Sequence, residues 1–197
     1  MKKNRTILIA GLFLVFQWMY AVAYCQPGSP YKISAVRLQA LDQRSFATTA
    51  LHKKLACFIF LSPECPLSQN YSVLLNKLAA EHNKDVDIVG VFPGKGYSFQ
   101  EYKKFKKKYH INFILLADRA SGLVKKLSAT TTPEAFLLND KNSILYHGSI
   151  DDWAISLGKQ RKTATQNYLQ DAINNYLAGM PISIKETKPI GCLINDL

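Results

Sequence analysis

The chain has 197 residues, of which 48% are hydrophobic and 20% charged, with a net charge of +11 and four cysteines. This composition excludes a disordered chain, a collagen-like repeat and a disulfide-dense miniprotein. One domain of ordinary size is expected, because the chain is long enough to bury a core. The cysteines are too widely spread for a disulfide scaffold, so each is interpreted from its surroundings.

The first residues have the pattern of a secretory signal peptide. Lys2, Lys3 and Arg5 precede an apolar stretch over residues 7–16, and Ala21-Val22-Ala23 offers small residues for cleavage. The stretch is short for a membrane span, although a retained anchor is an alternative. Cleavage would remove three cations and no anion and lower the net charge to +8. Export would place the cysteines where disulfides persist.

Cys25 introduces another alternative, because lipoproteins are processed just before a cysteine, although Tyr24 is bulky for that site. We predict a signal peptide over residues 1–23, a linker over 24–32 and one domain over 33–197. The protein is expected in the periplasm, in the cell envelope or outside the cell. Membrane association is expected only if the N-terminal segment is retained or Cys25 is lipidated.

The rest of the chain alternates between strand-like and helix-like patterns. Apolar runs and alternations predict strands at 33–38, 55–61, 86–92, 111–116, 135–138 and 144–146. Helical spacing predicts helices that begin at Pro66 and after Ser98, and helices over 121–127 and 163–177. This order predicts an α/β domain with a mixed central sheet, parallel strands in its centre, one antiparallel hairpin and helices on both faces.

Cys65 is the candidate nucleophile. It follows an apolar strand and opens a helix, where unpaired backbone N–H groups and the helix dipole favour a thiolate. Glu64 acts in the opposite direction, because an adjacent carboxylate raises the pKa of a thiol. A structural cysteine at a strand end is the alternative. Cys57, inside the apolar strand, is expected to be buried and inert.

Four segments together resemble a known family. Residues 60–68 (FLSPECPLS) with Gln69-Asn70-Tyr71 resemble the active-site segment of redoxins, which are thioredoxin-fold proteins of the alkyl hydroperoxide reductase/thiol-specific antioxidant (AhpC/TSA) family. Residues 131–138 (TTPEAFLL) and 144–152 (ILYHGSIDD) resemble the family's cis-proline loop and the hairpin strand after it. Residues 186–194 (ETKPIGCLI) resemble a tail of exported members. The resemblance implies a thioredoxin-like fold with a redoxin-type N-terminal strand extension and an inserted helix and strand.

The same resemblance implies a substrate site around the nucleophile. Thr132 and Pro133 would form a cis-proline loop whose backbone binds a peptide or a mixed-disulfide partner. Ser62, Pro66 and Ser68 would complete that site. Ser62 has the spacing of the threonine or serine that peroxiredoxins place three residues before their peroxidatic cysteine.

The chain also departs from the family pattern. Ser68 stands where a thioredoxin-type pair would have its second cysteine, so a local resolving thiol is missing. Phe58 stands where peroxiredoxins have a proline. Arg119 is a candidate for the arginine expected near the thiolate, although a solvated surface residue is its simpler interpretation.

Cys192 is the candidate resolving thiol. It lies in a Pro-Ile-Gly-Cys tail that could fold back, and no other cysteine follows Cys65. We therefore hypothesise a Cys65–Cys192 disulfide. The alternatives are that Cys192 pairs elsewhere, for example with Cys25, or stays free.

No other motif indicates a cofactor, a metal or a nucleic acid. The histidines have no ligand spacing, no C-x-x-C-H haem site occurs, and Gln69 stands where copper-delivery relatives have a second cysteine. Asp151-Asp152 is interpreted as a turn or a helix cap. The lysines after Ser98 are interpreted as the solvated face of a helix, so no nucleic-acid partner is expected.

These observations predict an exported thiol-dependent oxidoreductase. Cys65 would carry out thiol–disulfide exchange or peroxide reduction, with an external thiol reductant or a disulfide-bearing protein as partner. The alternative is a non-catalytic thioredoxin-like binding module, which the missing local cysteine and Glu64 favour.

Overall fold

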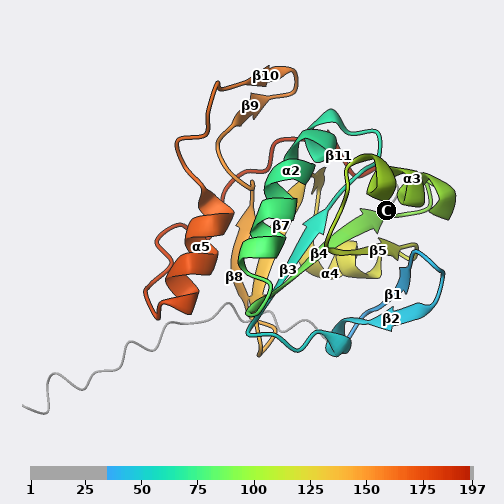
Figure 1. The fold of residues 1–197 in the computed structure, drawn as a ribbon, viewed down its shortest axis with the longest axis horizontal. Coiled ribbons are helices and arrows are strands. Elements are labelled where there is room, and N and C mark those ends of the chain that lie inside the picture. Colours follow the sequence, from blue (N-terminus) through green and yellow to red (C-terminus); the bar gives the residue numbers. More distant parts are fainter. Residues whose placement is uncertain (1–34, 196–197) are drawn as a thin grey trace, which may run out of the picture.

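The computed structural model describes residues 35–195, which fold around a seven-stranded mixed sheet (Figure 1). The strand order is β2-β1-β5-β4-β3-β7-β8. The three central strands are parallel: β3 (Leu55–Phe60), β4 (Val86–Pro93) and β5 (Ile114–Asp118). The edges are antiparallel hairpins: β1 (Arg37–Ala40) with β2 (Ser45–Ala47), and β7 (Glu134–Asn139) with β8 (Ile144–Gly148).

The predicted fold class is confirmed, and the sheet has one hairpin more than the sequence predicts. The additional strand β2 has three residues, all exposed or half-buried, so it lacks the apolar alternation that marks a strand. The first predicted strand (33–38) begins later, at Arg37, and residues 33 and 34 lie outside the described part of the chain. The strand predicted at 111–116 also begins later, at Ile114.

Helices cover the two faces of the sheet unequally. Three helices pack into one apolar cluster: α2 (Pro66–Glu81), α3 (Phe99–Lys108) and α5 (Tyr168–Leu177). The opposite face packs against α4 (Gly122–Leu127). The result is a layered α/β domain whose parallel strands are buried on both faces.

The last helix is shorter than predicted. The sequence pattern predicts a helix over 163–177, but α5 begins at Tyr168. The Asp152 carboxylate accepts hydrogen bonds from the backbone amides of Thr165 (2.6 Å) and Gln166 (3.0 Å) and from the Thr165 hydroxyl (2.6 Å). These bonds hold the residues before α5 in a loop. Asp152 therefore stabilises a turn, which agrees with its interpretation from the sequence.

Helix α3 has the N-terminus that the sequence predicts. The Ser98 hydroxyl accepts from the Glu101 amide (3.3 Å), and the Glu101 carboxylate accepts from the Ser98 amide (2.7 Å), which forms a capping box. Tyr102 and Phe105 are buried. The five lysines of this helix are exposed, so they form a solvated face.

Several short elements complete the domain: η2 (Thr48–Ala50), β6 (Thr131–Thr132), β9 (Ala154–Ser156), β10 (Lys159–Gln160) and β11 (Cys192–Leu193). Strands β9 and β10 form a projecting hairpin (Figure 1). Strands β6 and β11 pair with each other and bring the end of the chain back to the carboxyl end of β3.

The predicted signal peptide (1–23), the linker (24–32) and Cys25 lie outside the described residues, and the division of the chain into these segments stays a prediction. Within residues 35–195, no helix has the length and apolar character needed to cross a membrane.

Candidate functional site

Cys65 lies between the end of the central strand β3 and the first residue of α2, where it is the N-cap residue. Its amide donates to the Ser62 carbonyl (3.2 Å), and its own carbonyl accepts from the Gln69 amide (3.0 Å). Pro66 occupies the first turn of the helix, where it needs no backbone donor. The side chain of Cys65 is only 2% exposed. The sulfur atom therefore has a fixed place at the carboxyl end of a buried strand.

The structure brings Cys192 to Cys65, although 127 positions separate them. Strand β11 pairs antiparallel with β6 and places Cys192 opposite Thr132. The Thr132 hydroxyl donates to the Cys192 carbonyl at 3.3 Å. The two sulfur atoms lie 2.7 Å apart, and both cysteines are free thiols. Little movement therefore separates this arrangement from a disulfide.

The loop around Pro133 completes the surroundings of the sulfur. The Thr132–Pro133 peptide bond is cis, as the resemblance implies, and both residues are buried. The Cys65 thiol donates to the Thr132 carbonyl at 3.1 Å. The backbone edge that would bind a partner peptide therefore lies directly beside the Cys65 sulfur.

The two thiols have pKa values on opposite sides of the ordinary value. Burial by itself would raise the pKa of Cys65, but hydrogen bonds from the Cys192 thiol and amide and from the Ser68 amide and hydroxyl outweigh it and lower the pKa. Burial, together with the hydrogen bond and charge of Cys65, raises the pKa of Cys192 to about 12. Burial also raises the pKa of Cys57, which is completely buried in β3. Cys65 is therefore the thiol that ionises most easily among the three.

Ser68 is a buried positioning residue. Its side chain is 0% exposed, and its hydroxyl oxygen accepts from the Ser62 amide at 3.2 Å. Its own amide and hydroxyl lower the pKa of the Cys65 thiol. Ser68 stands where a thioredoxin-type pair has its second thiol. In this position it holds the loop and stabilises the Cys65 thiolate.

Tyr97 has no sequence pattern that marks it, yet it connects several predicted residues. The Ser62 hydroxyl donates to the Tyr97 hydroxyl, which in turn donates to the Glu64 carboxylate, each at 3.3 Å. Arg119 donates to the Tyr97 carbonyl at 2.7 Å. Arg119 is half-buried and braces the Tyr97 backbone, so it is neither a freely solvated residue nor a direct partner of the Cys65 sulfur.

Gly191 lets the tail approach the cis-proline loop. A Cβ atom at this position would lie 2.0 Å from the Thr132 carbonyl oxygen and 2.6 Å from its carbon, both backbone atoms. No other residue fits without displacing the strand. A glycine directly before the tail cysteine is the sequence signal that could have indicated this close contact.

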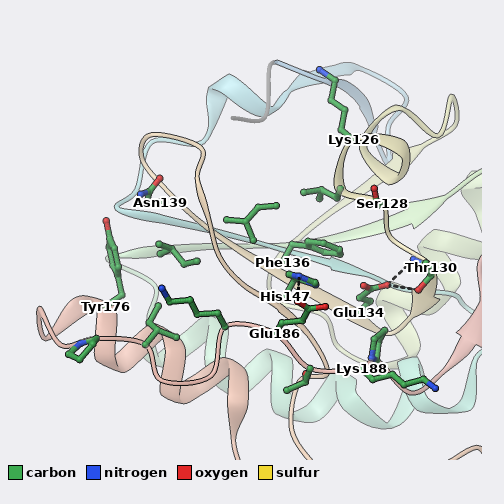
Figure 2. A pocket seen from close by; sticks show the side chains of 18 of the residues that line it. Lys126, Ser128, Thr130, Glu134, Phe136, Asn139, His147, Tyr176, Glu186 and Lys188 are labelled. Carbon is green, nitrogen blue, oxygen red and sulfur yellow. Dashed lines mark hydrogen bonds and ion pairs between the residues drawn. The ribbon is translucent and has the colours of Figure 1, made fainter. Parts of the chain in front are cut away.

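A wide groove with a volume of about 1310 Å³ is lined by α4, β7, β8, α5 and residues 179–182 and 185–189 (Figure 2). The His147 ring stacks on Phe136 with 5.6 Å between centroids, and its Nε2 lies 3.6 Å from the Glu186 carboxylate. The buried Glu134 carboxylate accepts from the amides of Thr130 (2.8 Å) and Thr131 (3.1 Å). Glu134 therefore braces the short strand β6 from the groove side.

No metal centre is found in the described part of the chain, where no three His, Cys, Asp or Glu side chains are placed to hold an ion. Asp151 is buried and accepts from the Tyr71 hydroxyl (2.5 Å) and the Trp153 amide (2.9 Å). The Trp153 bond is the local contact of a turn, whereas the Tyr71 bond joins Asp151 to α2 across 80 positions, so Asp151 also braces the core.

The sequence model of the Redoxin family matches residues 26–153. The chain belongs to the redoxin family. The matched region contains Cys65 and Pro133 and ends before the tail with Cys192. No curated protein sequence matches the chain.

Solved structures show that this redoxin has a thioredoxin-like fold. A hypothetical protein of Sinorhizobium meliloti superposes with a TM-score of 0.75 at 22% identity and covers 85% of this chain and 92% of its own. A secreted Mycobacterium tuberculosis disulfide oxidoreductase homologous to E. coli DsbE superposes with a TM-score of 0.53 at 19% identity. The match covers 74% of this chain and 96% of that protein. StoA from Bacillus subtilis superposes with a TM-score of 0.51 at 21% identity, and the match covers 60% of this chain and 89% of StoA.

Proposed function

We propose that this redoxin is a thiol–disulfide oxidoreductase in which Cys65 is the nucleophile and Cys192 the resolving thiol. The observation that carries the proposal is the pair of free thiols whose sulfur atoms lie 2.7 Å apart. The lowered pKa of Cys65 and the pKa of about 12 for Cys192 assign the first attack to Cys65.

The reaction begins with the Cys65 thiolate attacking one sulfur of a partner disulfide. That S–S bond breaks, the first partner thiolate leaves, and a mixed disulfide forms. The Cys192 thiol then loses its proton and attacks the Cys65 sulfur, which releases the second partner thiol and leaves a Cys65–Cys192 disulfide. Two electrons pass to the partner, and an external dithiol reductant restores the starting state.

Thr132, Pro133, Ser62, Pro66 and Ser68 are proposed to form the substrate site. The Thr132 backbone lies beside the nucleophile and offers hydrogen-bonding groups to an extended partner. Ser62 and Ser68 hold the loop that carries the nucleophile. Pro66 begins the helix that supports it.

Peroxide reduction is the second candidate, and the position of Ser62 favours it. The Cys65 thiolate would attack a peroxide oxygen to give a sulfenic acid and water or an alcohol, and the Cys192 thiol would condense with it and release water. The contacts of Ser62 and Arg119 weigh against this candidate, since both are made with Tyr97. Disulfide exchange is therefore the preferred assignment.

Export is part of the proposal. The N-terminal sequence has the pattern of a signal peptide, and one structural neighbour is described as secreted. Cys65 and Cys192 would then work where disulfides persist.

The test measures turnover of a protein disulfide and of hydrogen peroxide with an added dithiol reductant. Wild type is expected to reduce the disulfide, Cys65→Ser to be inactive, and Cys192→Ser to accumulate a mixed disulfide through Cys65. Cys57→Ala is the matched control, because this thiol is buried in the core. Equal rates for wild type and Cys65→Ser would refute the proposed oxidoreductase activity and favour a non-catalytic binding module.

A further inference from the structure

Residues 185–194, here called the tail, are attached to the domain at two separate places. At the first, the tail adds to the edge of β8, where the His147 amide donates to the Lys185 carbonyl (3.0 Å) and the Thr187 amide to the His147 carbonyl (3.1 Å). The Thr187 hydroxyl also accepts from the Ser149 amide at 2.9 Å. This attachment is independent of the thiol site.

The second attachment, residues 191–194, is here called the strap. It pairs with β6, so that Cys192 lies opposite Thr132, and the Ile194 amide donates to the Thr130 carbonyl (2.9 Å). Leu193 is 72% exposed, while Cys192 and Ile194 are half-buried and pack against the two core clusters, so the strap is held by backbone hydrogen bonds and two partly buried side chains. Segments held in this way open locally without global unfolding.

The strap occupies the place that a partner would need. The Cys65 sulfur contacts the Thr132 carbonyl, Ser68 and Cys192, and of these only Cys192 lies on a segment that can lift away. The thiol is 2% exposed while the strap is in place. The polar groups of the Thr132 backbone are also used by the strap.

We propose that the strap is a built-in pseudo-substrate, which must leave β6 before a partner cysteine can reach Cys65. The partner is then an extended polypeptide that pairs with β6 in the register of the strap. Because a Cβ at position 191 would lie 2.0 Å from the Thr132 oxygen, that polypeptide carries glycine directly before its cysteine. The partner's chemistry rests on the proposed function, whereas the masking of Cys65 by the strap does not.

The first test measures alkylation of Cys65 by iodoacetamide, read as peptide mass, in a Cys192→Ser background that removes the competing thiol. Adding Gly191→Ala, whose methyl group meets backbone, is expected to raise the rate by about tenfold or more, because the rate follows the population of the open form. Deleting residues 190–197 is expected to do the same. The alkylation rates of all variants are compared at a pH above the pKa of Cys65, so that the ionised fraction of Cys65 is the same in each.

The matched control is Asn195→Ala, an exposed position just after the strap, which is expected to leave the alkylation rate unchanged. Circular dichroism and thermal unfolding confirm that each variant is folded. Equal rates for Gly191→Ala, the deletion and the control would overturn the proposal, because the strap would then not protect Cys65. Alkylation needs no oxidoreductase activity, so this result is distinct from a failure of the proposed function.

The second test adds the peptide Pro-Ile-Gly-Ser-Leu-Ile to the chain that lacks residues 190–197. This peptide copies the strap without its thiol, so it can bind but cannot react. It is expected to slow the alkylation of Cys65, and the same peptide with alanine in place of glycine is expected not to. Equal effects of the two peptides, or no effect of either, would overturn the assignment of a glycine–cysteine partner.

Discussion

Replacing Ser68 by alanine removes one buried hydroxyl that has two roles. It accepts a hydrogen bond from the Ser62 amide at 3.2 Å, and it lowers the pKa of the Cys65 thiol. An unsatisfied donor costs about 1–3 kcal/mol when buried, and Ser62 is half-buried, so we expect Ser68→Ala to lose about 1–2 kcal/mol of unfolding free energy. We also expect the pKa of Cys65 to rise, because one group that stabilises its thiolate is lost.

Two measurements follow the two roles separately. Urea unfolding gives the loss of stability, and the ultraviolet absorbance of the thiolate against pH gives the midpoint of Cys65 ionisation. Cys57 does not interfere with the titration, because burial raises its pKa, and the pKa of Cys192 is about 12. The midpoint of Ser68→Ala is expected at a higher pH than that of wild type.

Ser72→Ala is the matched control on the same helix. Ser72 is equally buried, but its hydroxyl donates to the Ser68 carbonyl at 3.0 Å, within the helix. Such a bond adds little to a helix, so the change in stability is expected to stay within about 0.5 kcal/mol, with no change in the Cys65 midpoint. If Ser68→Ala behaved like Ser72→Ala in both measurements, the assignment of Ser68 as a positioning residue would be refuted.

Two further predictions, made with three substitutions, test other contacts of the site and its support. Cys192→Ala should raise the pKa of Cys65 more than Cys192→Ser does, because the serine hydroxyl can still donate to the thiolate. The same absorbance titration measures both variants. Equal midpoints would contradict the role of Cys192 as a hydrogen-bond donor to Cys65. Tyr71→Phe removes the phenol that donates to buried Asp151, with an expected loss of about 1–3 kcal/mol in urea unfolding. Burial raises the pKa of Asp151 and the Tyr71 hydrogen bond opposes that rise, so the loss should be larger at a pH where Asp151 is charged than at a pH where it is protonated. Equal losses at both pH values would show that this bond does not stabilise the charged carboxylate.

Local sequence was sufficient wherever neighbouring residues decide the conformation. The apolar run of β3, the helical spacing of α2 and the capping box at Ser98 all depend on residues within a few positions of one another. The position of Cys65 between a buried strand and a helix follows from the same patterns. Strand β2 and the start of α5 were missed, because a three-residue strand has no period and the loop before α5 is held by a distant Asp152.

By itself, the sequence determined the class of fold and the cysteine that opens α2, because local periodicity indicates both. The sequence also raised Cys192 and the Thr132–Pro133 loop as neighbours of that cysteine, with alternatives left open, and tertiary structure decided among them. It placed Cys192 against Cys65 across 127 positions, seated Gly191 on the Thr132 carbonyl and inserted Tyr97 between Ser62 and Glu64. The physical reason is that desolvation and hydrogen bonds set the pKa of a thiol, and the chain supplies them from segments far from it in sequence.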